Sequence, residues 1–266
     1  MRDLFSINKM STIVIKVGTN LLTDGRDIIY HEIIDKLVRQ IAVLIKEQNK
    51  KVILVSSGAI GCGMKIRRIK ERPKKMEKLQ ALAAIGQPYL MGLYREAFNQ
   101  YDIDIGQILM TKDDSKDSTR RDHLRNTIKT LLNLGVLPII NENDTVAVEE
   151  IAFGDNDTLT ALVALLLYSD IVIFLSTVDG LCTSNPDENE TFEVIPQVEK
   201  ITPEIEILAQ DCESRLSAGG MESKLKAAQK LTNVSIPIII ANGSKDNVIL
   251  DILLGKEIGT LFLPEK

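Results

Sequence analysis

The sequence is poor in the residue types that bind metals, form disulfides or present large aromatic surfaces. Of its 266 residues none is tryptophan, two are histidine and three are cysteine, and aromatic residues make up 4%. Cys62, Cys182 and Cys212 are odd in number and far apart, and neither they nor His31 and His123 have metal-site spacing. A disulfide framework is therefore not expected, and free cysteines fit a reducing cytoplasm.

Excess positive charge and long apolar runs are also missing. The net charge of −5 argues against a nucleic-acid binder that works through bulk charge. The apolar run at 159–167 is too short to span a membrane, and residues 1–10 lack the apolar region of a secretory signal. With 44% hydrophobic and 26% charged residues, the chain has the composition of a globular protein with an aliphatic core. We expect a cytoplasmic protein with neither a nucleic-acid nor a membrane partner.

Apolar strands alternate with helices along the chain. Buried strands are predicted at 12–17, 52–55, 136–140, 171–175 and 236–240, with further strands at 103–110 and 259–263. Helical spacing is found at 31–48, 79–98 (interrupted at 86–88), 124–134, 158–168 and 221–231. This order predicts an α/β fold with a mainly parallel sheet and helices on both faces.

Three segments between these elements are predicted as loops. Residues 58–63 are small and follow a strand, and residues 112–122 form a charged, flexible run. Residues 65–78 are strongly basic and contain Pro73. This basic segment could attract phosphate or acidic partners, but a solvated, mobile connection explains it more simply.

Two clusters of short polar side chains stand at the ends of apolar elements. They comprise Asn141, Asn143, Asp144, Asp155, Asn156 and Asp157. Two surface turns would account for them. However, polar residues beyond the carboxyl ends of parallel strands also form the rim where α/β proteins bind ligands. The pattern alone leaves both interpretations open.

Two lysines lie where positive charge is unexpected. Lys16 is inside an apolar strand, where a buried lysine needs an anionic partner, and Lys224 follows Gly219 and Gly220 at the start of a helix. Glycine in such loops lets backbone amides approach phosphate, although no Walker A or dinucleotide fingerprint is present. Because phosphoryl transfer requires positive charge and alignment, both lysines are candidates for it. Asp144 and Asp157 could hold these lysines, a metal or a substrate ammonium.

Six segments resemble, in order, the motifs of the amino acid kinase family. They are IKVGTN (15–20), VSSGAI (55–60), INEND (140–144), GDND (154–157), GGMESK (219–224) and ANGS (241–244). The third and fourth together are similar to the glutamate 5-kinase branch. The resemblance runs from about residue 11 to 263 and implies a three-layer α/β/α sandwich. It divides the chain into an N-terminal extension, 1–10, and a single kinase domain, 11–266, without the C-terminal PUA domain of many relatives.

The resemblance also implies an activity: ATP-dependent phosphorylation of the γ-carboxylate of L-glutamate to L-glutamyl 5-phosphate, the first step of proline biosynthesis. Ser57, Asp144 and Asn156 would then bind glutamate, with Asp144 paired to its ammonium. Lys16 and Lys224 would contact the phosphates, and Asp157 would orient both lysines.

The implied nucleotide site is a set of glycine-rich and hydroxyl-bearing residues at strand ends. It comprises Lys16, Gly18, Ser176, Thr177, Ala218, Gly219, Gly220, Met221, Glu222, Ser223 and Lys224. Mg²⁺ would arrive with ATP and bridge phosphate oxygens, so no residue is assigned as a metal ligand. The resemblance further implies a homo-oligomer and feedback inhibition by L-proline. The loop at 176–179 departs from the pattern of many relatives.

Two other functions stay open from the residues. A sibling enzyme could phosphorylate aspartate, N-acetylglutamate, carbamate or a nucleoside monophosphate. N-acetylglutamate has no free ammonium, so Asp144 would be unexpected there. A non-catalytic amino-acid sensor would have no need for both Lys16 and Lys224. The segment 146–153 is expected to form a short hairpin that closes over the substrate.

Overall fold

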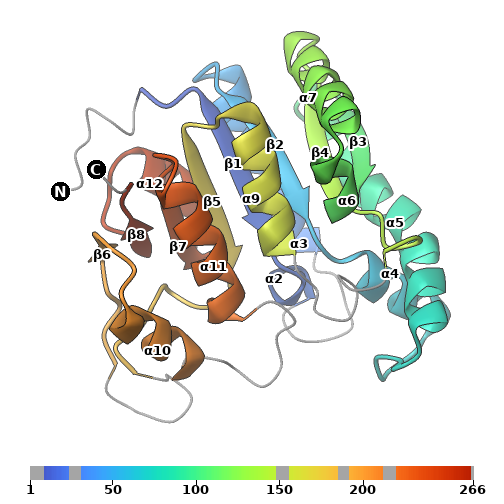
Figure 1. Cartoon of the computed structure of the whole chain (residues 1–266). Helices are drawn as coiled ribbons and strands as arrows, with labels where there is room; N and C mark the ends of the chain where they lie inside the picture. The colour runs from blue at the N-terminus through green and yellow to red at the C-terminus, as the bar shows by residue number, and fades with distance from the viewer. Residues whose placement is uncertain (1–8, 24–30, 148–155, 185–191, 212–219, 265–266) are drawn as a thin grey trace.

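In a computed structural model, one sheet of eight strands runs through the described part of the chain (Figure 1). The structure describes residues 9–23, 31–147, 156–184, 192–211 and 220–264. The strand order is β3-β4-β2-β1-β5-β7-β8-β6. Neighbouring strands are parallel except for β7 and β8, which are antiparallel.

The strands are β1 Thr12–Val17, β2 Lys51–Ser56, β3 Ile105–Met110, β4 Leu137–Glu142, β5 Ile171–Ser176, β6 Gln197–Val198, β7 Ile238–Asn242 and β8 Thr260–Phe262. The helices are α2 Thr19–Thr23, α3 His31–Lys46, α4 Ala59–Arg67, α5 Met76–Asn99, α6 Lys112–Lys116, α7 Ser118–Asn133, α9 Asn156–Leu167, α10 Pro203–Asp211, α11 Met221–Thr232 and α12 Val248–Leu253. The predicted strands and most predicted helices are confirmed, with ends shifted by a few residues. The short elements α2, β6, α10 and α12 were not predicted, because they are too short for a clear periodic signal.

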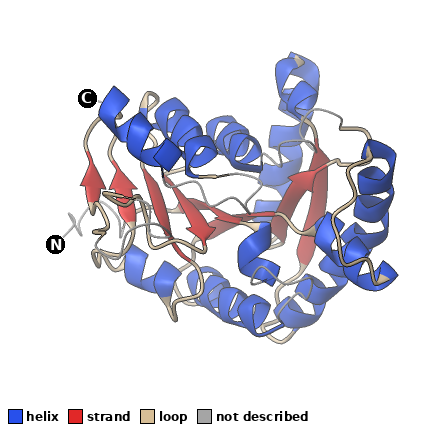
Figure 2. Ribbon diagram, turned by 90° about the horizontal axis from the view of Figure 1, so that it is seen from below, coloured by secondary structure: helices blue, strands red, loops and turns tan. Residues whose placement is uncertain are grey.

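The alternating side chains of β1 divide the apolar core into two layers. Ile13 and Ile15 belong to the layer that contains α2, α3, α5 and α12, and Val14 to the layer that contains α7, α9 and α11. Full burial of each such side chain stabilises the folded state by roughly 1.5–3 kcal/mol. Many buried aliphatic residues can therefore form a stable core without tryptophan. Viewed from below, the strands lie between two rows of helices (Figure 2). The predicted three-layer α/β/α sandwich is therefore confirmed.

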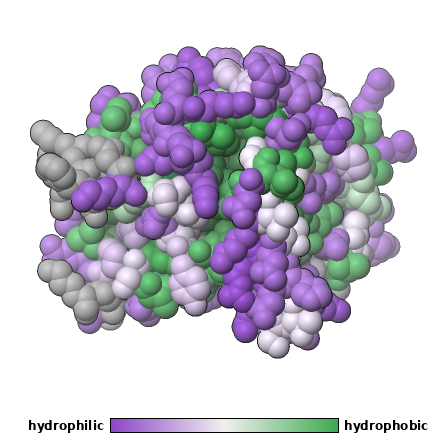
Figure 3. Space-filling view, turned by 90° about the horizontal axis from the view of Figure 1, so that it is seen from above, coloured by the Kyte–Doolittle hydropathy of each residue, from purple (hydrophilic) through white to green (hydrophobic). Residues whose placement is uncertain are grey.

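The two ends of the strands lie on opposite sides of the molecule. The carboxyl ends of β1, β2 and β5 point to the bottom of Figure 1. The surface seen from above, over the opposite edge, is mostly hydrophilic, with apolar residues visible in a central hollow (Figure 3). The candidate residues at strand ends consequently gather at the lower edge.

Helix α5 is continuous, so the predicted interruption at 86–88 is wrong. The helix includes Pro88, which removes one backbone hydrogen bond, a loss that packing against neighbouring elements offsets. A Cβ on Gly86 would lie 1.9 Å from the carbonyl oxygen of Ala59. Glycine at this position therefore allows α4 and α5 to approach closely and does not end the helix.

The charged segment at 112–122 is helical, so its prediction as a flexible loop is also wrong. Thr111 and Asp114 form a capping box at the start of α6, and the Asp117 side chain accepts a hydrogen bond from the amide of Arg120 at the start of α7. Such caps satisfy amides that have no partner inside the helix. Gly135, predicted to end this helix, follows it with φ +75°.

The small-residue and basic segments are partly helical as well. Residues 59–63 form the first part of α4, which Gly58 precedes with φ +111°. Only residues 68–75 of the basic segment connect α4 to α5. The hairpin predicted at 146–153 falls largely outside the described residues.

Candidate active site

Lys16 is placed by the alternation of β1 on the face covered by α9 and α11. It shares this face with Val14, because every second side chain of a strand points the same way. Its side chain is almost fully buried near the carboxyl end of the strand. A buried ammonium at this point needs a negative partner from one of the two covering helices.

That partner is Asp157, in the first turn of α9. Its Oδ1 lies 2.6 Å from Nζ of Lys16, and its Oδ2 lies 3.2 Å from Nζ of Lys224. Burial alone would raise the pKa of Asp157, but the charges of Lys16 and Lys224 outweigh it and lower the pKa to about 2. The carboxylate therefore stays ionised between two buried cations.

Helix α11 supplies the second lysine and a hydroxyl. The hydroxyl of Ser223 donates a hydrogen bond to Oδ2 of Asp157, and its Oγ also lies 3.1 Å from the carbonyl oxygen of Gly220. Lys224 also lies 3.3 Å from that carbonyl oxygen. The first turn of α11 is thereby tied to the first turn of α9. The Lys16–Asp157–Lys224 group is called the lysine cluster below.

A second polar network begins one residue earlier in α9. The side-chain amide of Asn156 donates to Oγ of Ser57 at 2.8 Å and to Oδ1 of Asn141 at 2.9 Å. The Asn141 amide donates in turn to Oε1 of Gln87 in α5, also at 2.9 Å. Asn156 and Asp157 are consecutive residues, so this network adjoins the lysine cluster. The predicted glutamate ligands Ser57 and Asn156 are thus next to the predicted phosphate ligands.

Asp144 lies just beyond the end of β4. Burial raises the pKa of its half-buried carboxyl to about 6, and the nearby charge of Arg72 acts in the opposite direction. In the described part of the chain, no hydrogen bond or ion pair joins Asp144 to Ser57 or Asn156. A ligand that used all three residues would have to bridge them.

The predicted nucleotide residues divide into those near the lysine cluster and those that turn away. Gly18 lies beside Lys16, and its amide donates to the carbonyl oxygen of Leu175 at 3.3 Å. Met221 packs in the core, and Glu222 forms an ion pair with Lys226, so neither side chain faces Asp157.

The other predicted nucleotide residues stand at the ends of neighbouring elements. Ser176 ends β5 and pairs with Asn242 of β7, and the exposed Thr177 follows it. Gly220 is the N-cap of α11. Ala218 and Gly219 fall outside the described residues.

Metal-binding side chains do not gather in the described part of the chain. No group of three or more His, Cys, Asp or Glu side chains there could hold a metal ion. Burial raises the pKa of the Cys62 thiol to about 12, Cys182 is buried too, and both histidines are exposed. Cys212 is not among the described residues. No described helix combines the length and apolar character that crossing a membrane requires.

Sequence reasoning missed three residues of this region. The pattern at 86–88 places Gln87 in a helix break, although it lies on the buried face of α5 between Ala83 and Leu90, where a polar side chain indicates a polar contact. Asn141 was recognised only as part of a polar rim. Arg72 was assigned to a solvated connection, because its proximity to Asp144 depends on tertiary structure.

Comparisons with known proteins identify the family to which this chain is similar. The model of the amino acid kinase family matches residues 11–242. The glutamate 5-kinase of Clostridium acetobutylicum is 44% identical over 97% of this chain and 97% of its own length, and that of Listeria monocytogenes is 41% identical over 98% and 96%. The glutamate 5-kinase of Moorella thermoacetica is 43% identical over 98% of this chain, which spans 69% of that relative.

Two solved structures share the fold at low sequence identity. UMP kinase from Bacillus anthracis has a TM-score of 0.63 and 14% identity, covering 97% of each chain. Isopentenyl phosphate kinase from T. acidophilum has a TM-score of 0.65 and 15% identity, covering 95% of this chain and all of that one. At such identity the likeness concerns the fold alone.

Proposed function

This chain belongs to the amino acid kinase family, and from that premise we propose that it transfers the γ-phosphate of ATP to the γ-carboxylate of L-glutamate. The proposal is supported by glutamate 5-kinases that are 41–45% identical over nearly the whole chain. The structural observation that carries it is that consecutive residues of α9 belong to the two networks, Asn156 to the pair with Ser57 and Asp157 to the lysine cluster.

The reaction forms an acyl phosphate. A γ-carboxylate oxygen of glutamate attacks the γ-phosphorus, the bond to the β,γ-bridging oxygen breaks, and ADP leaves with that electron pair. The protein's task is alignment and neutralisation of negative charge. Lys16 and Lys224 would place two ammonium groups on the phosphates, and Asp157 would hold both in position. An electrostatic contact of this kind contributes on the order of 10²–10³ in kcat.

The acceptor would be held through its amino-acid end. Asp144 would pair with the ammonium, and Ser57 and Asn156 would bind the α-carboxylate by hydroxyl and amide donors. The raised pKa of Asp144, about 6, leaves it mostly ionised at neutral pH, as an ammonium partner must be. The network through Asn141 and Gln87 would orient Asn156 for this contact.

The nucleotide would lie across the neighbouring strand ends. Gly18, Ser176, Thr177 and the segment from Ala218 to Lys224 would contact it, with Met221 and Glu222 contributing through their backbone. Mg²⁺ would accompany ATP and neutralise phosphate charge.

The proposal extends to the organisation of the enzyme. We infer a cytoplasmic homo-oligomer that L-proline inhibits, with residues 11–266 as its kinase domain and residues 1–10 as an extension. Size-exclusion chromatography with light scattering tests the assembly, and inhibition by proline is tested in the assay below.

The direct test is trapping of the acyl phosphate. The protein is incubated with ATP, Mg²⁺, L-glutamate and hydroxylamine, and γ-glutamyl hydroxamate is measured; hydroxamate that depends on ATP is the expected result. Aspartate, N-acetylglutamate, carbamate and UMP are tried in parallel, with ADP release as the readout. Turnover with one of these acceptors but not glutamate would favour a sibling kinase, and binding of an amino acid without any turnover would favour a sensor.

A further inference from the structure

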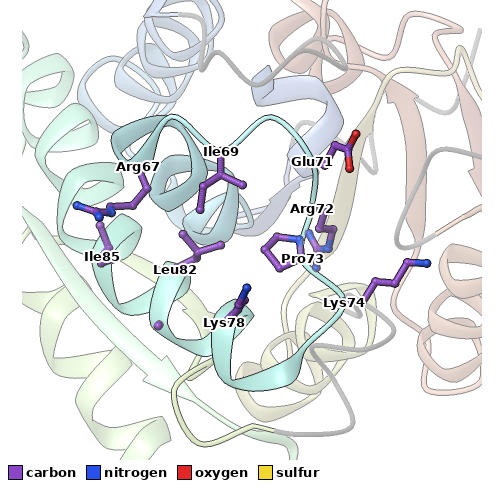
Figure 4. Close-up of a pocket in the computed structure, with 10 residues that line it drawn as sticks. Arg67, Ile69, Glu71, Arg72, Pro73, Lys74, Lys78, Leu82 and Ile85 are labelled. Carbon is purple, nitrogen blue, oxygen red and sulfur yellow. The ribbon is translucent and has the colours of Figure 1, made fainter.

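A cavity of about 710 Å³ opens between the end of α4 and the first turns of α5 (Figure 4). Its lining combines basic and apolar side chains with a single acid: Arg67, Ile69, Glu71, Arg72, Pro73, Lys74, Lys78, Ala81, Leu82 and Ile85. None of these residues belongs to the lysine cluster or to the Ser57–Asn156 network. The cavity therefore lies outside these two networks, although the charge of its Arg72 acts on Asp144.

The basic groups of the cavity stand over an apolar floor. In Figure 4, Ile69 and Leu82 lie side by side, the ammonium of Lys78 points up between Leu82 and Pro73, and Arg72 lies beside Pro73. The side chains of Glu71 and Lys74 extend outward. Within the described residues, neither Arg72 nor Lys78 forms an ion pair. Lys78, together with Arg72, whose charge also acts on Asp144, places positive charge beside an apolar surface, and such a site is complementary to an anion with an apolar body.

We propose that this cavity binds a small organic anion, with its acidic group on Lys78 and Arg72 and its apolar part against Ile69 and Leu82. A carboxylate, sulfonate or phosphate ester would meet the same two cations. The apolar floor would add affinity that inorganic phosphate lacks.

The cavity is connected to the loop that carries Asp144. Arg72 lines the cavity, and its charge also acts on Asp144. The side-chain amide of Gln80 donates to the carbonyl oxygen of Ala147 at 3.2 Å, and Ala147 packs in the same apolar cluster as Leu82. The hydrogen bond of Gln80 with its surrounding apolar packing, and the charge interaction of Arg72 with Asp144, therefore link the cavity to the segment that follows β4.

This link implies regulation of the acceptor site, an inference that depends on the proposed function. In the empty cavity, the positive charge of Arg72 near Asp144 opposes the approach of a substrate ammonium. A bound anion neutralises Arg72 and removes this opposition, so it lowers KM for glutamate and leaves kcat nearly unchanged. By linkage, glutamate tightens binding of the anion by the same factor.

Binding is tested first, without reference to catalysis. The full chain, with MgATP present to fill the nucleotide site, is titrated with anilinonaphthalenesulfonate, an apolar anion whose fluorescence rises in apolar surroundings. Lys78→Gln is expected to raise the dissociation constant about tenfold, the effect of losing one charge-assisted hydrogen bond. Ile85→Glu, which puts a negative charge at the cavity, is expected to weaken binding at least as much.

The matched control is Lys70→Gln, which removes an exposed lysine of the same connection that does not line the cavity. It should bind the probe like the unaltered protein. Equal binding by the Lys78→Gln and Lys70→Gln variants would overturn the proposal. A second outcome would also overturn the proposal. If the probe fluorescence disappears on dilution at the concentration where the protein dissociates, the probe-binding cavity requires a second copy of the chain.

Coupling is tested second, in the hydroxamate assay. The probe should lower KM for glutamate in the unaltered protein and in Lys70→Gln, but not in Lys78→Gln. Probe binding without any change in KM would refute the link to Asp144. Because fluorescence does not require turnover, a failure of the proposed glutamate activity remains distinguishable from a failure of the cavity to bind anions.

Discussion

The ammonium group of Lys16 lies 2.6 Å from Oδ1 of Asp157, and both side chains are almost fully buried. One belongs to the first strand and the other to the first turn of α9. Lys224 lies on the other oxygen of the same carboxylate. Two buried cations around one anion leave a net positive charge, which the phosphates of a nucleotide would neutralise.

Removal of the carboxylate should destabilise the protein. Asp157→Asn leaves Lys16 and Lys224 buried without their anion, and we expect a loss of about 3–5 kcal/mol in the free energy of unfolding. Urea denaturation measures the loss. The control is Asp113→Asn, which breaks an exposed pair with Lys116 and should cost less than about 1 kcal/mol.

The difference in free energy of unfolding between the unaltered protein and Asp157→Asn should become smaller at low pH. The pKa of Asp157 is lowered in the folded state to about 2, from an ordinary value of about 3.9. Its contribution is therefore present above pH 4 and is lost as the pH falls through 2. The stability gap between the unaltered protein and Asp157→Asn should shrink over this interval, and a gap that is independent of pH would contradict the ion-pair account.

The two buried lysines should affect turnover more than acceptor binding. Lys16→Met and Lys224→Met keep much of the apolar stem but remove the charge, and we expect kcat to fall on the order of 10²–10³-fold. Lys226→Met is the matched control, since Lys226 lies on α11 but pairs with Glu222 on the exposed surface. Steady-state hydroxamate formation measures all three; a similar loss in Lys226→Met would contradict the proposed roles.

Asp144 should make acceptor binding depend on pH. Because burial raises its pKa to about 6, the carboxylate that pairs with the substrate ammonium is lost below that pH. KM for glutamate should rise about tenfold per pH unit below 6 and level off above it. Asp144→Asn should have a high KM without this inflection, and KM for ATP serves as the internal control. An unchanged glutamate KM in the variant would exclude the ammonium role.

Two glycines of α5 should respond in opposite ways to alanine. Gly92 has open space around its Cα, so Gly92→Ala should stabilise the helix by about 0.5–1 kcal/mol. At Gly86 the new Cβ would lie 1.9 Å from the carbonyl oxygen of Ala59 and force α4 away, costing about 1–3 kcal/mol. Thermal unfolding of both variants measures the contrast. Stabilisation by both would mean that α4 and α5 do not pack closely at this point.

Two predictions failed because one local sequence feature was opposed by another influence: low hydrophobic periodicity by a capping pair, and a proline by helix packing. The helices at Lys112–Lys116 and Ser118–Asn133 have few buried residues, so hydrophobic periodicity did not reveal the first of them, whereas the capping pair Thr111 and Asp114 could have. Pro88 does not break α5, because tertiary contacts hold α5 against α4 and a local pattern does not reveal them.

The contacts of Gln87 and Arg72 could not be predicted in the same way. The side-chain amide of Asn141 donates to Gln87, which lies 54 residues earlier in the chain, and the charge of Arg72 acts on Asp144, which belongs to a different segment. Neither contact has a counterpart in the local sequence pattern.

By itself, the sequence determined the alternation of strands and helices and the aliphatic nature of the core, because periodicity depends on neighbours a few residues apart. Its resemblance to a family predicted Lys16, Asp157 and Lys224 as one group. Only the tertiary structure decided which strand ends meet: β1 lies between β2 and β5, with α9 and α11 packed over it. Strand order depends on packing between segments far apart in the chain, and a local pattern carries no information about that packing.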